Sequence, residues 1–360
     1  MRRARGMGLA AAALVGALTL AACGNSDDNG NGNGSGGGGT AAPTSDLKVG
    51  MAYDIGGRGD KSFNDSAAVG LDKAKTDLGI PANNVRELSA RANETDTDRA
   101  TRLELLAKGG FNPIIAVGFA YAPALKTVAP KYPDVHFGIV DATPDDVKGP
   151  NIENLTFAEE QGSFLVGAAA ALKTATGTVG FVGGCQVPLI AKFEAGFKAG
   201  AEKAKPGIKV VSKYLSTPQQ GCSGFNDPAA GQESAKGMYD GGADIVYAAA
   251  GGSGSGVFKA AAAANKKAIG VDSDQYLTAD PSVQKTIITS MIKSVNVAVL
   301  DFITSAKDDK FTAGQKVFDL KVDGVGYATS GGAVDDIKTK LDDYKKQIVD
   351  GTIKVPTTVS

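Results

Sequence analysis

The chain has 360 residues, of which 42% are hydrophobic and 21% charged, so it has enough apolar material for a folded core. Its 38 Lys and Arg balance 39 Asp and Glu, whereas a nucleic-acid binder would carry a basic excess. One His and three Cys argue against a His-rich metal site or a zinc ribbon. We therefore expect an α/β protein with no metal, no cofactor and no nucleic-acid partner.

Residues 1–22 have the pattern of an export signal. A basic start with three Arg precedes an apolar run over residues 7–20, which is too short for a comfortable membrane span. The run ends in L-A-A-C, and small residues before Cys23 fit the lipobox of bacterial lipoproteins, in which the Cys is acylated after cleavage. An ordinary secretory signal followed by a chance Cys is the alternative. We predict a lipidated Cys23 that anchors the protein at the extracytoplasmic face of the cell membrane.

The segment 23–46 follows the lipobox and consists mainly of Gly, Asn, Ser, Asp and Thr. Such a composition buries little and behaves as a flexible coil with a reach of about 26 Å. We expect a tether between the lipid anchor and the folded part of the chain.

Two further cysteines, Cys185 and Cys222, lie in the chain beyond the tether. Thiols of exported proteins tend to oxidise. We predict a Cys185–Cys222 disulfide, with two unpaired thiols as the alternative.

From residue 47 onward, short apolar runs alternate with longer amphipathic ones. Strands are predicted over 48–53, 85–88, 114–117, 137–140 and 155–157, and in a second series over 179–182, 209–214, 245–248, 268–271 and 286–289. Helices are predicted between them, over 62–78, 99–108, 160–172, 189–204, 233–240 and 256–265. After residue 293 we expect a helix (294–306), a strand (317–322) and a last helix (334–349).

These repeated βα units predict parallel sheets covered by helices on both faces. Ten strands would strain one compact sheet, and the series breaks near residues 157–160. Two doubly wound lobes are the simplest arrangement, with a ligand at the carboxyl ends of the strands, where both lobes face a cleft.

The loop after the first strand carries the most informative motif. Residues 54–64 read D-I-G-G-R-G-D-K-S-F-N, and its glycines would let the backbone approach a ligand closely. A Gly-rich turn with a capping Ser is the structural alternative. Phe63 and Asn64 favour the ligand, because a ring and an amide can stack on and hydrogen-bond a flat polar molecule.

Other polar residues follow later strands. Asp141 and Asp272 each end a strand, and a carboxylate can accept hydrogen bonds from a sugar diol or from purine N–H groups. Helix capping is the alternative for each carboxylate, and solvation at the surface is the alternative for Lys293. Residues 251–256, G-G-S-G-S-G, lack the Lys of a P-loop and favour close packing against a neutral ligand. The pair Glu159-Glu160 is interpreted as solvated charge or as a helix-start preference.

The motif at 54–64 resembles the opening motif of the basic membrane protein family of substrate-binding lipoproteins, which includes purine nucleoside receptors of bacterial ABC importers. Further segments that are similar, in the same order, are F-G-I-V-D at 137–141, G-S-F-L-V-G at 162–167, V-G-G at 182–184, F-E-A-G-F at 193–197, A-G-G-S-G at 250–254 and T-S-M-I-K at 289–293. Cys185 departs from the pattern, because an ordinary loop residue is expected after Gly183-Gly184.

The resemblance implies a type I periplasmic-binding-protein fold with a nucleoside closed between two lobes that are joined by a three-stranded hinge. Residues 47–157 plus about 290–312 would form the N-terminal lobe, and residues 158–289 plus about 313–360 the C-terminal lobe. The implied roles are Phe63 stacking on the base, Asn64 and Asp141 bonding its edge, Asp272 and Lys293 holding the ribose hydroxyls, Asp54 and Gly252 lining the cleft, and Phe193 forming the opposite stacking face.

The function expected from these features is a lipid-anchored receptor, monomeric and not an enzyme, that delivers a nucleoside to an ABC permease. A receptor for a sugar or another small polar ligand on the same fold is the alternative. A tethered hydrolase that acts on nucleosides through Asp carboxylates is a further alternative. The sequence disfavours the hydrolase, because it shows no nucleophile–base set and no metal ligands.

Overall fold

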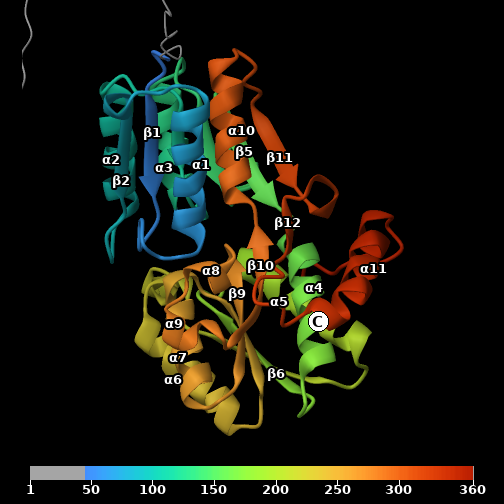
Figure 1. Cartoon of the computed structure of the whole chain (residues 1–360). Helices are drawn as coiled ribbons and strands as arrows, with labels where there is room; N and C mark the ends of the chain where they lie inside the picture. Colours follow the sequence, from blue (N-terminus) through green and yellow to red (C-terminus); the bar gives the residue numbers. More distant parts are fainter. Residues whose placement is uncertain (1–44, 360) are drawn as a thin grey trace, which may run out of the picture. The chain divides into compact units, whose positions relative to one another are not determined.

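The computed structural model describes residues 45–359 (Figure 1). The predicted signal peptide, the predicted lipidation site Cys23 and nearly all of the predicted tether lie outside these residues.

Two six-stranded sheets organise the described chain. In spatial order, the first sheet contains β11 (Gly314–Phe318), β5 (Ile152–Phe157), β4 (Phe137–Val140), β3 (Ile114–Ala116), β1 (Val49–Tyr53) and β2 (Val85–Ser89). The second contains β12 (Val325–Tyr327), β10 (Ile287–Lys293), β9 (Lys267–Asp272), β8 (Ile245–Ala249), β6 (Thr178–Gly183) and β7 (Lys209–Tyr214). Neighbouring strands are parallel except for the antiparallel pair β10–β12. Two doubly wound parallel sheets were predicted, and the fold confirms them.

Helices cover both sheets, as the continuous apolar strands require. Those of the first lobe are α1 (Phe63–Asp77), α2 (Asp96–Lys108), α3 (Ala122–Val128) and α10 (Val295–Lys307). Those of the second are α4 (Glu159–Lys173), α5 (Pro188–Ala204), α6 (Pro228–Asp240), α7 (Gly254–Ala263), α8 (Gln275–Thr278), α9 (Pro281–Gln284) and α11 (Lys338–Val349). In Figure 1, α1 and α10 lie side by side over the first sheet. The short helices α3, α8 and α9 were not predicted.

The chain passes between the sheets three times, after β5, after β10 and after β11. The expected lobe boundaries need correction, because β10 stays in the second sheet up to Lys293 and β11 pairs with β5 of the first sheet. The strand expected at 317–322 lies instead at Gly314–Phe318. Only the first two residues of the expected range belong to β11, which is mostly exposed, while Leu320–Val322 forms a 3₁₀ turn.

The helices α4 and α5 pack unusually closely in the second lobe. A Cβ atom at Gly196 would overlap the main-chain oxygen of Glu160, and one at Gly200 would overlap that of Phe164. These two glycines therefore set the distance between the helices, and α5 in turn carries cleft residues at its N-terminal end.

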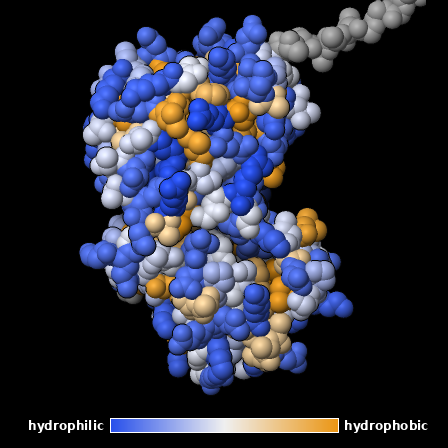
Figure 2. All heavy atoms as spheres, turned by 90° about the vertical axis from the view of Figure 1, so that its left-hand side faces the viewer, coloured by the Kyte–Doolittle hydropathy of each residue, from blue (hydrophilic) through white to orange (hydrophobic). Residues whose placement is uncertain are grey.

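The surface differs from the core in the expected way. On the face in Figure 2, hydrophilic side chains predominate and hydrophobic ones form small separate groups. Among residues 45–359, no helix combines the length and the apolar character that a membrane span would need.

Candidate functional site

A cavity of about 60 Å³ lies between the two lobes, several times the roughly 10–15 Å³ that one water requires. The residues that line it lie at or just after the carboxyl ends of β1, β3, β4, β8, β9 and β10, or in α1, α5 and nearby loops. Of the eight predicted ligand-binding residues, the structure brings seven together here: Asp54, Phe63, Asn64, Asp141, Phe193, Asp272 and Lys293. Gly252 instead borders an adjoining groove, and its neighbour Gly251 lines the cavity.

Asp60 organises the loop that leads into α1. Its carboxylate accepts hydrogen bonds from the backbone N–H groups of Ser62, Asn64 and Asp65 at 2.9–3.1 Å. A carboxylate at the start of a helix satisfies N–H groups that have no partner within the helix. Asp60 therefore fixes the position from which Phe63, the first residue of α1, reaches the cavity.

Asn64 braces the same loop from inside. Its Oδ1 accepts a hydrogen bond from the Asp54 N–H at 3.0 Å, and its Nδ2 donates to the Ile55 carbonyl at 3.2 Å and to Asp60 at 3.0 Å. Both amide hydrogens are thus used within the protein, and one lone pair of Oδ1 remains. The predicted contact of Asn64 with the edge of a base can use only that lone pair in this arrangement.

Asp54 is half-buried directly after β1, where its Oδ1 accepts a hydrogen bond from the Ile55 N–H at 2.8 Å. Burial raises the pKa of Asp54 to about 6. A Cβ atom at Gly118, whose φ is +109°, would lie 2.6 Å from Asp54 Oδ2. Glycine is therefore required opposite this carboxyl group.

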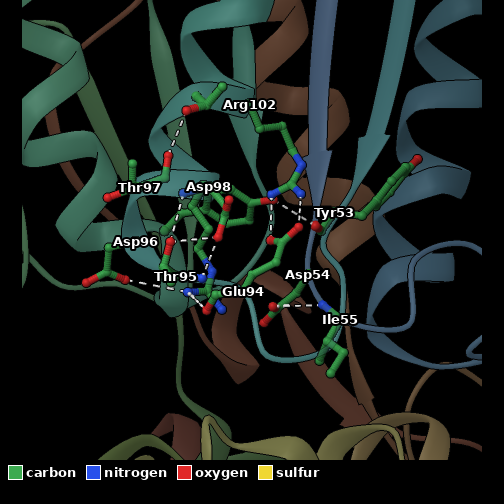
Figure 3. Close-up of polar contacts among 12 residues, drawn as sticks. Tyr53, Asp54, Ile55, Glu94, Thr95, Asp96, Thr97, Asp98 and Arg102 are labelled. Atoms are coloured by element: carbon green, nitrogen blue, oxygen red, sulfur yellow. Dashed lines mark hydrogen bonds and ion pairs between the residues drawn. The ribbon is translucent and has the colours of Figure 1, made fainter.

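A polar cluster holds the main chain next to Asp54 in place (Figure 3). Arg102 forms a buried ion pair with Glu94 and donates a hydrogen bond to the Tyr121 hydroxyl at 3.0 Å. Tyr121 in turn donates to the carbonyl of Tyr53, the residue before Asp54, at 2.9 Å. The cluster therefore holds the carboxyl end of β1 through the carbonyl group of Tyr53.

The charged end of the cavity is built around Lys293, which is only 2% exposed. Its Nζ donates to Asp141 Oδ2 at 2.6 Å and lies 3.6 Å from Glu159 Oε1. Burial lowers the pKa of Lys293, but the carboxylates of Asp141, Glu159 and Asp272 outweigh it and raise the pKa overall. The side chain is therefore an ammonium at neutral pH.

Aromatic rings surround the same ammonium. Nζ of Lys293 lies 5.1 Å from the ring centres of Phe63 and Phe157 and 5.5 Å from that of Phe193. A cation at this distance from a ring centre is attracted by the π electrons. All three rings thus stand beside the charged end of the cavity.

Glu159 was interpreted from the sequence as solvated charge or a helix-start preference, and the solvated reading is wrong. The side chain is 1% exposed, and neither of its oxygens has a hydrogen-bond partner among the described residues. Burial raises the pKa of Glu159 to about 7. Its neighbour Glu160 is also buried, so the same correction applies there. No local signal indicated the burial of either residue, because it depends on the crossing of the chain between the sheets.

Asp272 joins the two lobes directly. It accepts a hydrogen bond from the Ser62 hydroxyl of the first lobe at 2.6 Å, and burial raises its pKa to about 6. Two further bonds cross the cleft beside it, from Ser273 Oγ to the Ser62 carbonyl and from Gln275 Nε2 to the Lys61 carbonyl. The lobes are therefore in contact across the cleft.

Phe225 and Phe119 are cavity residues that the sequence interpretation missed. Phe225 comes from the second lobe and meets Phe119 of the first lobe edge to face, with ring centres 6.5 Å apart. The other unpredicted lining residues are Ile55, Asp60, Gly118, Leu189, Ile190, Ala249, Gly251 and Val271. Phe225 lies in a long irregular loop, so neither periodicity nor a strand end marked it.

The structure also contains the Cys185–Cys222 disulfide, with the two Cα atoms 5.1 Å apart. Cys185 precedes α5, which carries Phe193, and Cys222 lies three residues before Phe225. The crosslink therefore joins two segments that both contribute to the cavity.

The chain matches known proteins along almost all of its described length. The family model for the PnrA-like ABC transporter substrate-binding proteins matches residues 47–359. The CD4+ T-cell-stimulating antigen of Listeria monocytogenes is 35% identical over 87% of this chain and 89% of its own length. The ABC transporter nucleoside-binding protein BmpA of Lactococcus lactis is 34% identical over 87% and 90%.

Solved structures agree with the sequence relatives. An ABC transporter solute-binding protein from Aeropyrum pernix superposes with a TM-score of 0.73 at 27% identity and covers 87% of this chain and 94% of that one. The predicted periplasmic-binding-protein fold is confirmed by this neighbour. The chain belongs to the PnrA-like, or basic membrane protein, family of ABC transporter substrate-binding proteins.

Proposed function

We propose that the cleft binds a purine nucleoside and that the protein, as a monomer, delivers it to an ABC import permease. The observation that carries this proposal is the pairing, in one cavity, of aromatic walls with a buried cluster of carboxyl and ammonium groups. A nucleoside also has two such parts: a flat base, which can lie against aromatic walls, and a sugar with several hydroxyls, which can bond to charged groups.

The charged end suits the sugar. The hydroxyls of a ribose diol can donate to the carboxylate of Asp272, while the ammonium of Lys293 donates to a ribose oxygen. Asp141 Oδ1 is buried and has no hydrogen-bond partner among the described residues. Such an acceptor is costly when left unsatisfied, which favours a ligand donor next to it.

The aromatic part suits the base. Phe63 is held at the start of α1 by the braced loop, and Phe225 enters from the other lobe. A purine between such faces gains stacking energy without needing a particular pattern of hydrogen bonds. Asp54 and the free lone pair of Asn64 would then meet polar groups at the edge of the base.

The family membership supports a receptor rather than a tethered hydrolase, because the family consists of substrate-binding proteins. The name of the Lactococcus lactis relative supports a nucleoside over a sugar.

Calorimetric titration of the purified protein tests the ligand class. We expect binding of inosine, adenosine or guanosine and weaker binding of ribose and arabinose, because the sugars cannot fill the aromatic part of the cavity. Native mass spectrometry of the protein as purified would identify a retained ligand. Tight binding of a free sugar with no response to any nucleoside would replace this proposal by the sugar-receptor alternative.

The delivery step needs the protein at the membrane, and the lipobox at Cys23 supports a lipid anchor. We expect Cys23→Ala to release the protein from the membrane fraction or to leave it unprocessed. Wild-type protein recovered free of the membrane with an unmodified Cys23 would contradict the anchor.

A further inference from the structure

The connection between β7 and α6, residues 215–227, is here called the β7–α6 loop. It contains only two short 3₁₀ turns, Pro218–Gln220 and Ser223–Phe225, yet it delivers the Phe225 ring to the cavity. An irregular loop of this length has many alternative conformations. The position of Phe225 therefore has to be set by contacts outside regular secondary structure.

Besides main-chain hydrogen bonds, two serine hydroxyls connect the loop to neighbouring segments. Ser216 Oγ donates to the Gly184 carbonyl at 2.7 Å and accepts from the Gly224 N–H at 3.0 Å. Ser253 Oγ donates to the Gly224 carbonyl at 2.7 Å and accepts from the Asp227 N–H at 2.6 Å. These bonds run between neutral groups, and such bonds are individually weak in water.

The disulfide is the covalent member of this set. Cys222 adopts a left-handed backbone conformation, with φ +52°, three residues before Phe225. Its partner Cys185 is fully buried beside Gly184, and a Cβ atom at Gly184 would overlap the Phe225 ring. The crosslink therefore attaches the loop to the segment on which the Phe225 ring rests.

The loop also meets the first lobe. Besides the ring contact between Phe225 and Phe119, a small space of about 30 Å³ is lined by Gly221 and Cys222 on one side and by Arg91 and Arg99 on the other. The order of this loop consequently affects the contact between the lobes as well as the wall of the cavity.

We infer that the Cys185–Cys222 disulfide is a positioning element of the binding site, which orders the β7–α6 loop and so holds Phe225 in place as a wall of the cavity before a ligand arrives. Ordering a loop in advance removes a cost that would otherwise reduce affinity. With inosine as the probe, this inference rests on the proposed function, whereas the order of the loop can be measured without a ligand.

A double-mutant cycle separates this role from general stabilisation. The four proteins are the wild type, Cys185→Ala/Cys222→Ala, Phe225→Ala and the triple variant, each titrated with inosine. Loss of the disulfide should weaken binding by about tenfold in the wild-type background and by less than about twofold once Phe225 is absent. An equal factor in both backgrounds would overturn the inference.

Hydrogen exchange on the ligand-free proteins provides the readout that does not depend on function. Amides of residues 215–227 should exchange at least about tenfold faster without the disulfide, and unchanged exchange would also overturn the inference. Ser216→Ala, which keeps the disulfide, tests the same loop if the Cys variant folds poorly. With the crosslink intact, exchange of residues 215–227 should rise by less than about threefold. A larger increase would show that the serine bonds rather than the disulfide order the loop, and would overturn the inference.

Thr174→Val is the matched control, because Thr174 donates to Asp244 at the opposite end of the second-lobe sheet. It should leave exchange in the loop and inosine affinity unchanged, and an equal loosening of the loop by this variant would contradict a specific role of the disulfide. If the wild type binds no nucleoside, the proposed function fails, while the exchange comparison still decides whether the disulfide orders the loop.

Discussion

The charged end and the aromatic walls of the cavity are positioned in different ways. Asp141, Asp272 and Lys293 stand at the ends of buried strands, and both aspartates have left-handed backbone conformations there, with φ +70° and +65°. Phe63 and Phe225, in contrast, are carried by a loop–helix junction and by an irregular loop. The charged end is thus part of the framework, while the walls depend on local braces.

This difference has an energetic consequence. Charges that are buried between two sheets interact strongly with one another, so that removing one leaves the others uncompensated. A ring on a braced loop can be removed with a smaller effect on the fold. We therefore expect substitutions at the charged end to affect both stability and binding, and substitutions in the walls to affect mainly binding.

The largest effect is expected from Lys293→Met, which removes the ammonium between Asp141 and Glu159. Breaking a buried ion pair from one side costs about 3–5 kcal/mol of unfolding free energy, and nucleoside binding should fall below detection. Urea unfolding and calorimetry measure the two effects. Lys346→Met, at an exposed ion pair of α11, is the control and should change neither quantity appreciably.

Asp272→Asn keeps the shape of the side chain and its hydrogen bond from Ser62 but removes the charge. Because a hydrogen bond to a charged group contributes about 1.5–3 kcal/mol, nucleoside affinity should fall by about tenfold to a hundredfold. Free bases should be affected far less, since Asp272 is assigned to the ribose. Equal losses for nucleosides and bases would refute that assignment, and Asp244→Asn, in the same lobe away from the cavity, is the control.

Phe63→Leu tests the aromatic walls. Stacking on an aromatic face is worth about 1–3 kcal/mol per base, so nucleoside affinity should fall by about fivefold to a hundredfold while the unfolding midpoint changes little. Phe111→Leu is a control at a comparably half-buried ring on the far side of the first sheet. A Phe63 variant that binds as tightly as wild type would show that the base does not lie on this ring.

The smallest expected effect is a pH dependence of the free energy of unfolding, caused by carboxyl groups in and near the charged end. Burial raises the pKa of Glu159 to about 7 and the pKa of Asp54 and Asp272 to about 6, all above their ordinary values. The folded state therefore binds more protons than the unfolded chain, and its stability is lost as the pH rises through these values.

Urea unfolding of the ligand-free protein should accordingly give a lower free energy of unfolding at about pH 8 than at about pH 5.5. Glu159→Gln should reduce the difference, because the amide does not titrate. A stability that increases with pH over this range, or the same pH dependence in the variant, would argue against a buried titrating Glu159.

The same contrast explains which residues of the candidate site could be located from the sequence. Buried parallel strands have continuous apolar runs, so the strand ends and the residues that follow them, such as Asp141 and Asp272, could be located from the pattern. Phe225 could not be located in this way, because it lies in an irregular loop away from any strand end. The assignment of Phe193 as the opposite stacking face stays a prediction.

Two other features depend on tertiary structure that the sequence does not display. β11 is short and mostly exposed, and it belongs to the first sheet only because β5 offers it an open edge. Glu159 and Glu160 are both buried because the chain crosses between the sheets at that point, and no local signal along the chain indicated this. A hydrophobicity pattern can predict only those features that residues close together in the sequence determine.

A crystal structure of the protein grown with inosine tests the central claim most directly. The account predicts the hypoxanthine ring against Phe63, with the ribose hydroxyls within hydrogen-bond distance of the Asp272 carboxylate and the Lys293 ammonium. A cavity that stays empty at saturating inosine, or a ligand that is turned so that its ribose lies between Phe63 and Phe225 and its base contacts the Asp272 carboxylate, would contradict the account.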